Sequence, residues 1–124
     1  MIKYMLDHRP AKVRAQFIAH EGQMCISTVT LMELYYGAEK SSVPERNLAE
    51  IEQFAGRLVV LDYDSEAAAH TGQIRAEPKV AGKSIGPYDQ MIAGHARSSG
   101  LIVVTNNVKE FKRVTGLRVE NWAN

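Results

Sequence analysis

Short apolar segments alternate along this chain with segments of helical periodicity. Five of them have the length and composition of buried strands, at residues 2–6, 24–27, 58–62, 101–105 and 117–119. Helical patterns or helix-start signals fill most of the intervals, at residues 11–20, 31–37, 44–55, 65–76, 87–96 and 108–114. Strands that alternate with helices favour a parallel sheet covered by helices. The sequence therefore predicts an α/β fold with a central five-stranded, mainly parallel sheet flanked by helices.

Length and composition restrict the class of protein. A chain of 124 residues is predicted to form one domain, residues 1–124, with room for a core. The net charge is +1, so any basic surface for nucleic acid must be local. The single cysteine, Cys25, excludes an internal disulfide and a cysteine-based metal site. No apolar run approaches the roughly 20 residues of a membrane span, and no signal peptide opens the chain. We therefore expect a cytoplasmic protein without membrane contact.

Polar and acidic side chains follow or flank the ends of the predicted strands. They are Asp7, Glu33, Asp89, Asn107 and Glu110. Asp7 ends the first strand, and Asp89 lies in the first turn of the helix that Gly86 and Pro87 introduce. Reactive groups of a parallel sheet gather at the carboxyl ends of its strands. If the first and fourth strands are neighbours, these five side chains converge although they lie far apart in sequence.

Glu33 takes its place from the helix that follows the second strand. Thr28 or Thr30 is the expected cap of a helix over residues 31–37. Either cap would put Glu33 within the first turn of that helix.

Carboxylates brought together repel one another unless a cation lies between them. A site with only oxygen ligands suits Mg²⁺ or Mn²⁺. Such an ion can orient and deprotonate a water for attack on a phosphodiester and can stabilise the leaving oxygen. The alternative is that each acid is a solvated residue at a strand end and that Asp89 only caps its helix. Spacing alone leaves both interpretations open.

Four stretches of the chain carry a resemblance to a known family. They are residues 4–7, 25–40, 86–93 and 104–107, the last followed by Glu110 and Phe111. These stretches occur in the order found in the PIN-domain ribonucleases, which the sequence resembles. It resembles specifically the VapC toxins of type II toxin–antitoxin systems. The run over residues 25–40 is similar to the enteric branch that cuts initiator tRNA.

The resemblance implies a PIN-like fold and a Mg²⁺-dependent endoribonuclease, with Mn²⁺ as a possible substitute. It implies cleavage of RNA in the anticodon region of initiator tRNA. It also implies homodimers that assemble into a larger complex with a VapB-like antitoxin, whose tail enters the active-site groove. By the same resemblance Asp7, Glu33 and Asp89 are the metal-binding acids, with Asp7 and Asp89 in direct contact with the ion.

Other positions follow from the same comparison. Asn107 occupies the place where many relatives have a fourth Asp, and its amide can still accept a hydrogen bond or hold a water. Glu110 is the candidate for the charge that Asn107 lacks. Thr105 matches a hydroxyl that relatives place beside the site, where it supports a metal ligand.

One departure from the family follows Asp7. Relatives continue with Thr-Asn or Ser-Asn and a helix of about three turns, whereas here Asp7 is followed directly by His8 and Arg9. Either this chain has a true deletion, or about ten residues of the molecule are missing from the printed sequence. We favour the second explanation and expect residues 7 and 8 not to be bonded neighbours.

Two other functions are compatible with parts of the pattern. A phosphoacceptor receiver domain would use Asp62 as acceptor with Asp7 and Thr105 nearby, but it needs paired acids after the first strand and a Lys after the last. A PIN fold without activity would bind antitoxin or RNA as a scaffold, and a true deletion after Asp7 would favour it.

Overall fold

The central element is a five-stranded sheet in which every paired neighbour is parallel. The computed structural model describes residues 1–7, 14–78, 80 and 85–122. The strands are β1 (Tyr4–Leu6), β2 (Met24–Ser27), β3 (Val59–Leu61), β4 (Ile102–Val104) and β5 (Val119–Glu120). Their order is β3-β2-β1-β4-β5. The predicted α/β fold is confirmed, and β1 and β4 are the neighbours that the predicted site requires.

Helices connect the strands in the order that the sequence predicts. They are α1 (Arg14–Ala19), α2 (Thr28–Lys40), α3 (Pro44–Ala55), α4 (Ser65–Ala76), α5 (Pro87–Ser98) and α6 (Val108–Phe111). No helix in the described part of the chain is long and apolar enough to span a membrane. The hypothesis about the junction between Asp7 and His8 falls on residues outside those that the structure describes.

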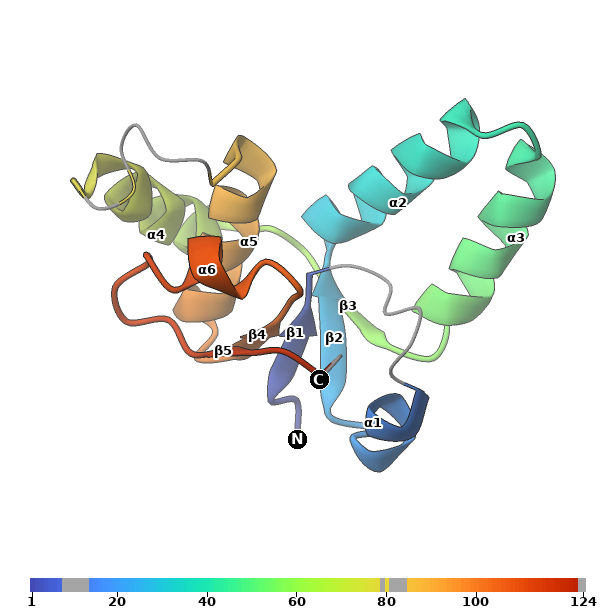
Figure 1. Cartoon of the computed structure of the whole chain (residues 1–124), viewed down its shortest axis with the longest axis horizontal. Coiled ribbons are helices and arrows are strands. Elements are labelled where there is room, and N and C mark those ends of the chain that lie inside the picture. Colours follow the sequence, from blue (N-terminus) through green and yellow to red (C-terminus); the bar gives the residue numbers. More distant parts are fainter. Residues whose placement is uncertain (8–13, 79, 81–84, 123–124) are drawn as a thin grey trace.

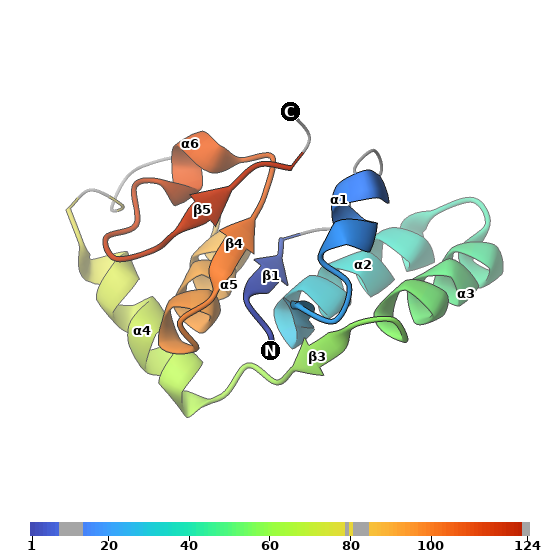
Figure 2. The same cartoon turned by 90° about the horizontal axis from the view of Figure 1, so that it is seen from below.

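Alternate side chains of the strands point to opposite faces and build two hydrophobic clusters. Met5, Cys25 and Val103 pack with residues of α4, α5 and α6. Leu6, Ile26 and Val104 pack with residues that include Phe17 of α1 and Phe54 of α3. The sheet is therefore the middle layer between helices, with α4 and α5 together on one side and α2 and α3 side by side as a hairpin on the other (Figures 1 and 2).

The position of α5 depends on a close approach to α4. A Cβ added at Gly94 would lie 2.7 Å from the backbone nitrogen of Thr71, a distance that real side chains do not adopt. Glycine is therefore required at residue 94 for α5 to lie this close to α4. The packing fixes the helix that carries Asp89.

The start of α2 differs from the prediction. Ser27, the last residue of β2, caps the helix by accepting a hydrogen bond of 3.1 Å from the backbone N–H of Val29. The expected caps were therefore wrong, and Glu33 lies in the second turn of α2 rather than the first. The strand passes into the helix without a loop, and the β-branched residues at its start have low helix propensity. For this reason the sequence pattern did not indicate the first turn of α2.

Candidate functional site

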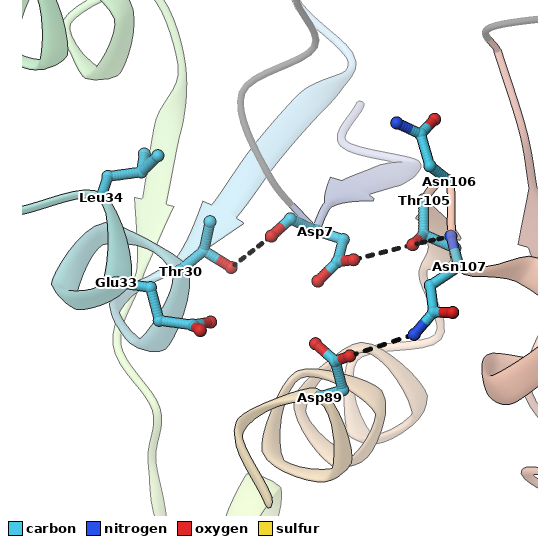
Figure 3. A pocket seen from close by; sticks show the side chains of 8 residues that line it. All are labelled: Asp7, Thr30, Glu33, Leu34, Asp89, Thr105, Asn106 and Asn107. Carbon is cyan, nitrogen blue, oxygen red and sulfur yellow. Dashed lines mark hydrogen bonds between the residues drawn. The ribbon is translucent and has the colours of Figure 1, made fainter. Parts of the chain in front are cut away.

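A pocket of about 380 Å³ opens at the carboxyl edge of the sheet. The described residues that line it are Asp7, Thr30, Glu33, Leu34, Asp89, Thr105, Asn106 and Asn107 (Figure 3). No Lys or Arg is among these lining residues. Negative charge in the pocket is therefore not balanced by a basic side chain of the described lining.

The strands and helices around the pocket determine where each of its side chains lies. Asp7 follows β1 and the 105–107 segment follows β4, and the parallel pairing of these strands brings both ends to one edge. Glu33 projects from α2, and Thr30 lies one turn earlier on the same helix. Asp89 lies in the first turn of α5, where Pro87 begins the helix and the helix dipole favours a carboxylate. The carboxylates of the three acids point toward a common centre (Figure 3).

Hydrogen bonds from the β4 side hold two of the acids. The Thr105 hydroxyl donates to Oδ2 of Asp7 at 2.7 Å and accepts from the backbone N–H of Asn107 at 2.9 Å. The Asn107 amide donates to Oδ2 of Asp89 at 3.4 Å. Thr105 and Asn107 thus orient one carboxylate each, one from β1 and one from α5.

The electrostatics of the pocket oppose full ionisation. Burial, followed by the charge of Asp7, raises the pKa of Asp89 to about 6 from its usual 3.8, although the bond from Asn107 acts in the opposite direction. Burial and the charge of Asp7 also raise the pKa of Glu33. Both shifts have the causes expected when carboxylates share a partly buried site.

The donor set suits a hard cation that keeps part of its water. Among the described residues, no group of three or more His, Cys, Asp or Glu side chains is arranged to hold a metal ion by itself. Mg²⁺ in proteins usually contacts one or two carboxylates and retains waters or binds substrate phosphates. Asp7 and Asp89 are the candidate pair, since each influences the other electrostatically across the pocket. Glu33 adds a third charge to the same pocket.

The structure brings together four of the five side chains expected to converge. Asp7, Glu33, Asp89 and Asn107 line the pocket, and Thr105 lies beside Asp7. Glu110 is not one of the described lining residues. It lies on the short helix α6, and the residue that follows it, Phe111, is fully buried in the core.

Three lining residues were not found from sequence, namely Thr30, Leu34 and Asn106. Thr30 shares a helix face with Glu33, and its hydroxyl donates to the backbone carbonyl of Asp7 at 3.4 Å. Asp62, the acceptor of the receiver hypothesis, follows the edge strand β3 and is not among the described lining residues. That hypothesis therefore has no site in this pocket.

Known proteins share this fold and sequence. The PIN domain family matches residues 1–117. The chain is 61% identical to the tRNA(fMet)-specific endonuclease VapC of Shigella flexneri, over 99% of this chain and 100% of that protein. The crystal structure of DNA-bound VapBC from Salmonella typhimurium contains a chain 57% identical to this one, with a TM-score of 0.90 over 98% of this chain and 99% of that one.

VapBC2 from Rickettsia felis, solved with a DNA fragment from its promoter, gives 32% identity and a TM-score of 0.86 over 98% of this chain and 99% of that one. The chain therefore belongs to the PIN-domain family, and within it to the VapC ribonucleases. PIN nucleases generally depend on a divalent metal.

The Shigella alignment also bears on the departure after Asp7. It extends over 132 positions, more than the 124 residues of this chain. That relative therefore has residues without a counterpart here. Their location after Asp7 is our prediction.

Proposed function

We propose that this protein is a Mg²⁺-dependent endoribonuclease that hydrolyses a phosphodiester bond in the anticodon region of initiator tRNA. The observation that carries the proposal is the convergence of Asp7, Glu33 and Asp89 in a pocket without a described basic lining residue. The substrate is inferred from the Shigella relative, whose name gives it as a tRNA(fMet)-specific endonuclease.

The residues divide the work between them. Asp7 and Asp89 would hold Mg²⁺, which supplies an activated water and positive charge for the phosphate oxygens. Thr105 keeps Asp7 in one orientation, and Asn107 does the same for Asp89. Glu33 raises the negative potential that attracts the cation. Water is the nucleophile in this scheme, so the expected products carry 5′-phosphate and 3′-hydroxyl ends.

We further propose a VapB-like antitoxin as partner, since the Salmonella and Rickettsia relatives were solved as VapBC complexes. Its tail would occupy the acidic pocket and exclude RNA. The homodimer, its assembly with antitoxin into a larger complex, and the cytoplasmic location remain parts of this proposal.

The decisive experiment compares initiator tRNA with an elongator tRNA, each incubated with antitoxin-free protein in Mg²⁺ or in EDTA. Asp89→Asn is assayed in parallel. The matched control is Asp62→Asn, the same chemical change at an exposed residue after the edge strand. We expect cleavage of the initiator only, lost in EDTA and in Asp89→Asn and retained in Asp62→Asn.

RNA binding by folded wild-type protein without cleavage in Mg²⁺ would instead support the scaffold hypothesis. Phosphorylation at Asp62 by acetyl phosphate would support the receiver hypothesis.

A further inference from the structure

The described lining of the pocket has an acidic floor and two residues of a different kind. Asp7, Glu33 and Asp89 supply the charge, and Thr30, Thr105 and Asn107 hydrogen-bond to Asp7 or Asp89. Leu34 and Asn106 do neither. Leu34 comes from α2 and Asn106 from the segment after β4, and they lie on opposite sides of Asp7 (Figure 3). Leu34 is the one apolar side chain in the described lining.

Asn106 differs from the residues on either side of it. The Thr105 hydroxyl and the Asn107 amide both bond to acids of the floor, whereas the Asn106 amide points away from the three carboxylates (Figure 3). Its side chain is exposed and makes no hydrogen bond to another described residue. It therefore presents a free N–H donor and a free carbonyl acceptor at the edge of the pocket.

The chemistry of this pair selects a class of ligand. A neutral amide is a poor partner for a phosphate, which Arg, Lys or a metal ion binds more strongly. Its adjacent donor and acceptor do match the edge of a nucleobase, and Asn side chains make such paired contacts to bases. Proteins that read RNA sequence do so mostly on unstacked bases of loops, whose edges and faces are both accessible.

We propose that Asn106 is a specificity-determining residue that reads the edge of the nucleobase next to the scissile phosphate, while Leu34 packs against the face of that base. The inference rests on the proposed function, because the floor must hold the phosphate for the neighbouring base to reach these two residues. Asn106 discriminates between bases, whereas Leu34 contributes affinity that every base shares, since contacts to a base face tolerate sequence change.

The test uses initiator tRNA transcripts in which the base on each side of the cleaved bond is varied to all four identities. The kcat/KM of each transcript is measured with Mg²⁺ for wild type, Asn106→Ala, Asn106→Asp and Leu34→Ala. Ratios between transcripts are compared, because a change that only weakens phosphate binding affects all transcripts equally. Asn47→Ala is the matched control, since Asn47 lies on α3 and not in the described lining.

At one of the two positions we expect a wild-type preference that falls by about tenfold in Asn106→Ala. Asn106→Asp, which loses the donor, shifts the preference toward bases that donate at that edge. Leu34→Ala raises KM for every transcript and keeps the order of bases, and Asn47→Ala behaves as wild type. Thermal unfolding checks that each variant is folded.

Three outcomes overturn the inference alone: wild type cleaves all four bases equally, Asn106→Ala keeps the wild-type preference, or Asn106→Ala lowers all rates by one factor. If folded wild type cleaves no transcript in Mg²⁺, the proposed function fails and the inference fails with it.

Discussion

Two polar clusters lie between α2 and α5, and they are built on opposite plans. In the first, which is not part of the pocket lining, His95 of α5 and Ser27 at the start of α2 share a hydrogen bond of 2.8 Å. Beside them the Tyr63 hydroxyl donates to Thr71 at 2.8 Å, and the Tyr63 ring lies edge-on to His95. Burial lowers the pKa of His95, so this cluster is neutral near pH 7. Its polar groups are paired within the protein.

The pocket, in contrast, gathers several acidic side chains. Their burial and mutual repulsion raise the pKa of Asp89 and of Glu33. The described hydrogen bonds from Thr105 and Asn107 orient two of the acids through uncharged groups. This difference is the one expected between a structural polar cluster and the metal site that we propose. The first is complete in the folded chain, whereas the second would become favourable with a bound cation.

The largest effect is expected where an acid that we propose to bind the metal is removed from the pocket. Asp7→Asn should lower Mg²⁺-dependent cleavage by more than the roughly 10- to 100-fold typical of residues that only support a metal ligand. The fold should persist, because the substitution removes one of several repelling charges. Steady-state cleavage of tRNA measures the effect, with Asp62→Asn as control. Cleavage within tenfold of wild type would remove Asp7 from the site.

Substitutions in the cluster of His95, Ser27, Tyr63 and Thr71 should lower the stability of the protein rather than its cleavage activity. Ser27→Ala removes the α2 cap and leaves His95 without its partner, at a cost of about 2 kcal/mol in the free energy of unfolding. Urea unfolding measures this loss, and Ser42→Ala at an exposed position serves as control. A change below about 0.5 kcal/mol, the range of ordinary surface substitutions, would mean that water or neighbouring groups replace both bonds.

Thr105→Val tests whether the Thr105 hydroxyl is needed to orient Asp7, because valine has almost the same side-chain shape as threonine. The variant loses the bond to Asp7 and leaves the N–H of Asn107 without its acceptor. We expect Mn²⁺ or Mg²⁺ to bind about tenfold more weakly, as measured by calorimetry. Thr115→Val, at an exposed threonine outside the described lining, should bind as wild type. Unaltered affinity in Thr105→Val would show that Asp7 needs no such support.

The smallest effect depends on pH. Because the pKa of Asp89 is about 6 in the folded protein and 3.8 is its usual value, the folded state binds the proton more tightly. Stability of the metal-free protein therefore falls as pH rises from about 4 to about 6. Asp89→Asn removes this fall. The expected gain at pH 7 is about 1 kcal/mol after allowance for solvent screening at this half-exposed carboxyl.

Thermal unfolding in EDTA at pH 4 and pH 7 checks this prediction. The variant should match wild type at pH 4 and exceed it at pH 7. Added Mg²⁺ should stabilise wild type more than the variant. If Asp89→Asn and wild type differed in stability by the same amount at pH 4 and pH 7, ionisation of Asp89 would not be the cause.

The sequence predicted the fold well where local chemistry dominates. Apolar runs identified the strands, and Gly86 with Pro87 correctly indicated a helix that has Asp89 in its first turn. The start of α2 was wrong because three β-branched residues conceal a turn that Ser27 caps.

The site was harder to predict because it depends on strand order. The sequence allowed convergence only if β1 and β4 were neighbours, and packing of the whole sheet decides that. Glu110, on α6, is not among the described lining residues, and its role stays a prediction. Asn106 and Thr30 have no signal of their own, since their places depend on partners far away in sequence.

The bond from Thr105 to Asp7 joins residues 98 positions apart, and this separation has a consequence during translation. A nascent chain carries Asp7 and Glu33 well before the β4 segment is synthesised, whereas Asp89 is made shortly before it. At about 5–20 residues per second, the interval between Asp7 and Thr105 lasts roughly 5–20 seconds. Through that time the pocket has no wall on the β4 side. The site is therefore completed only after the β4 segment has been made, and a partner synthesised alongside this chain has those seconds to accumulate.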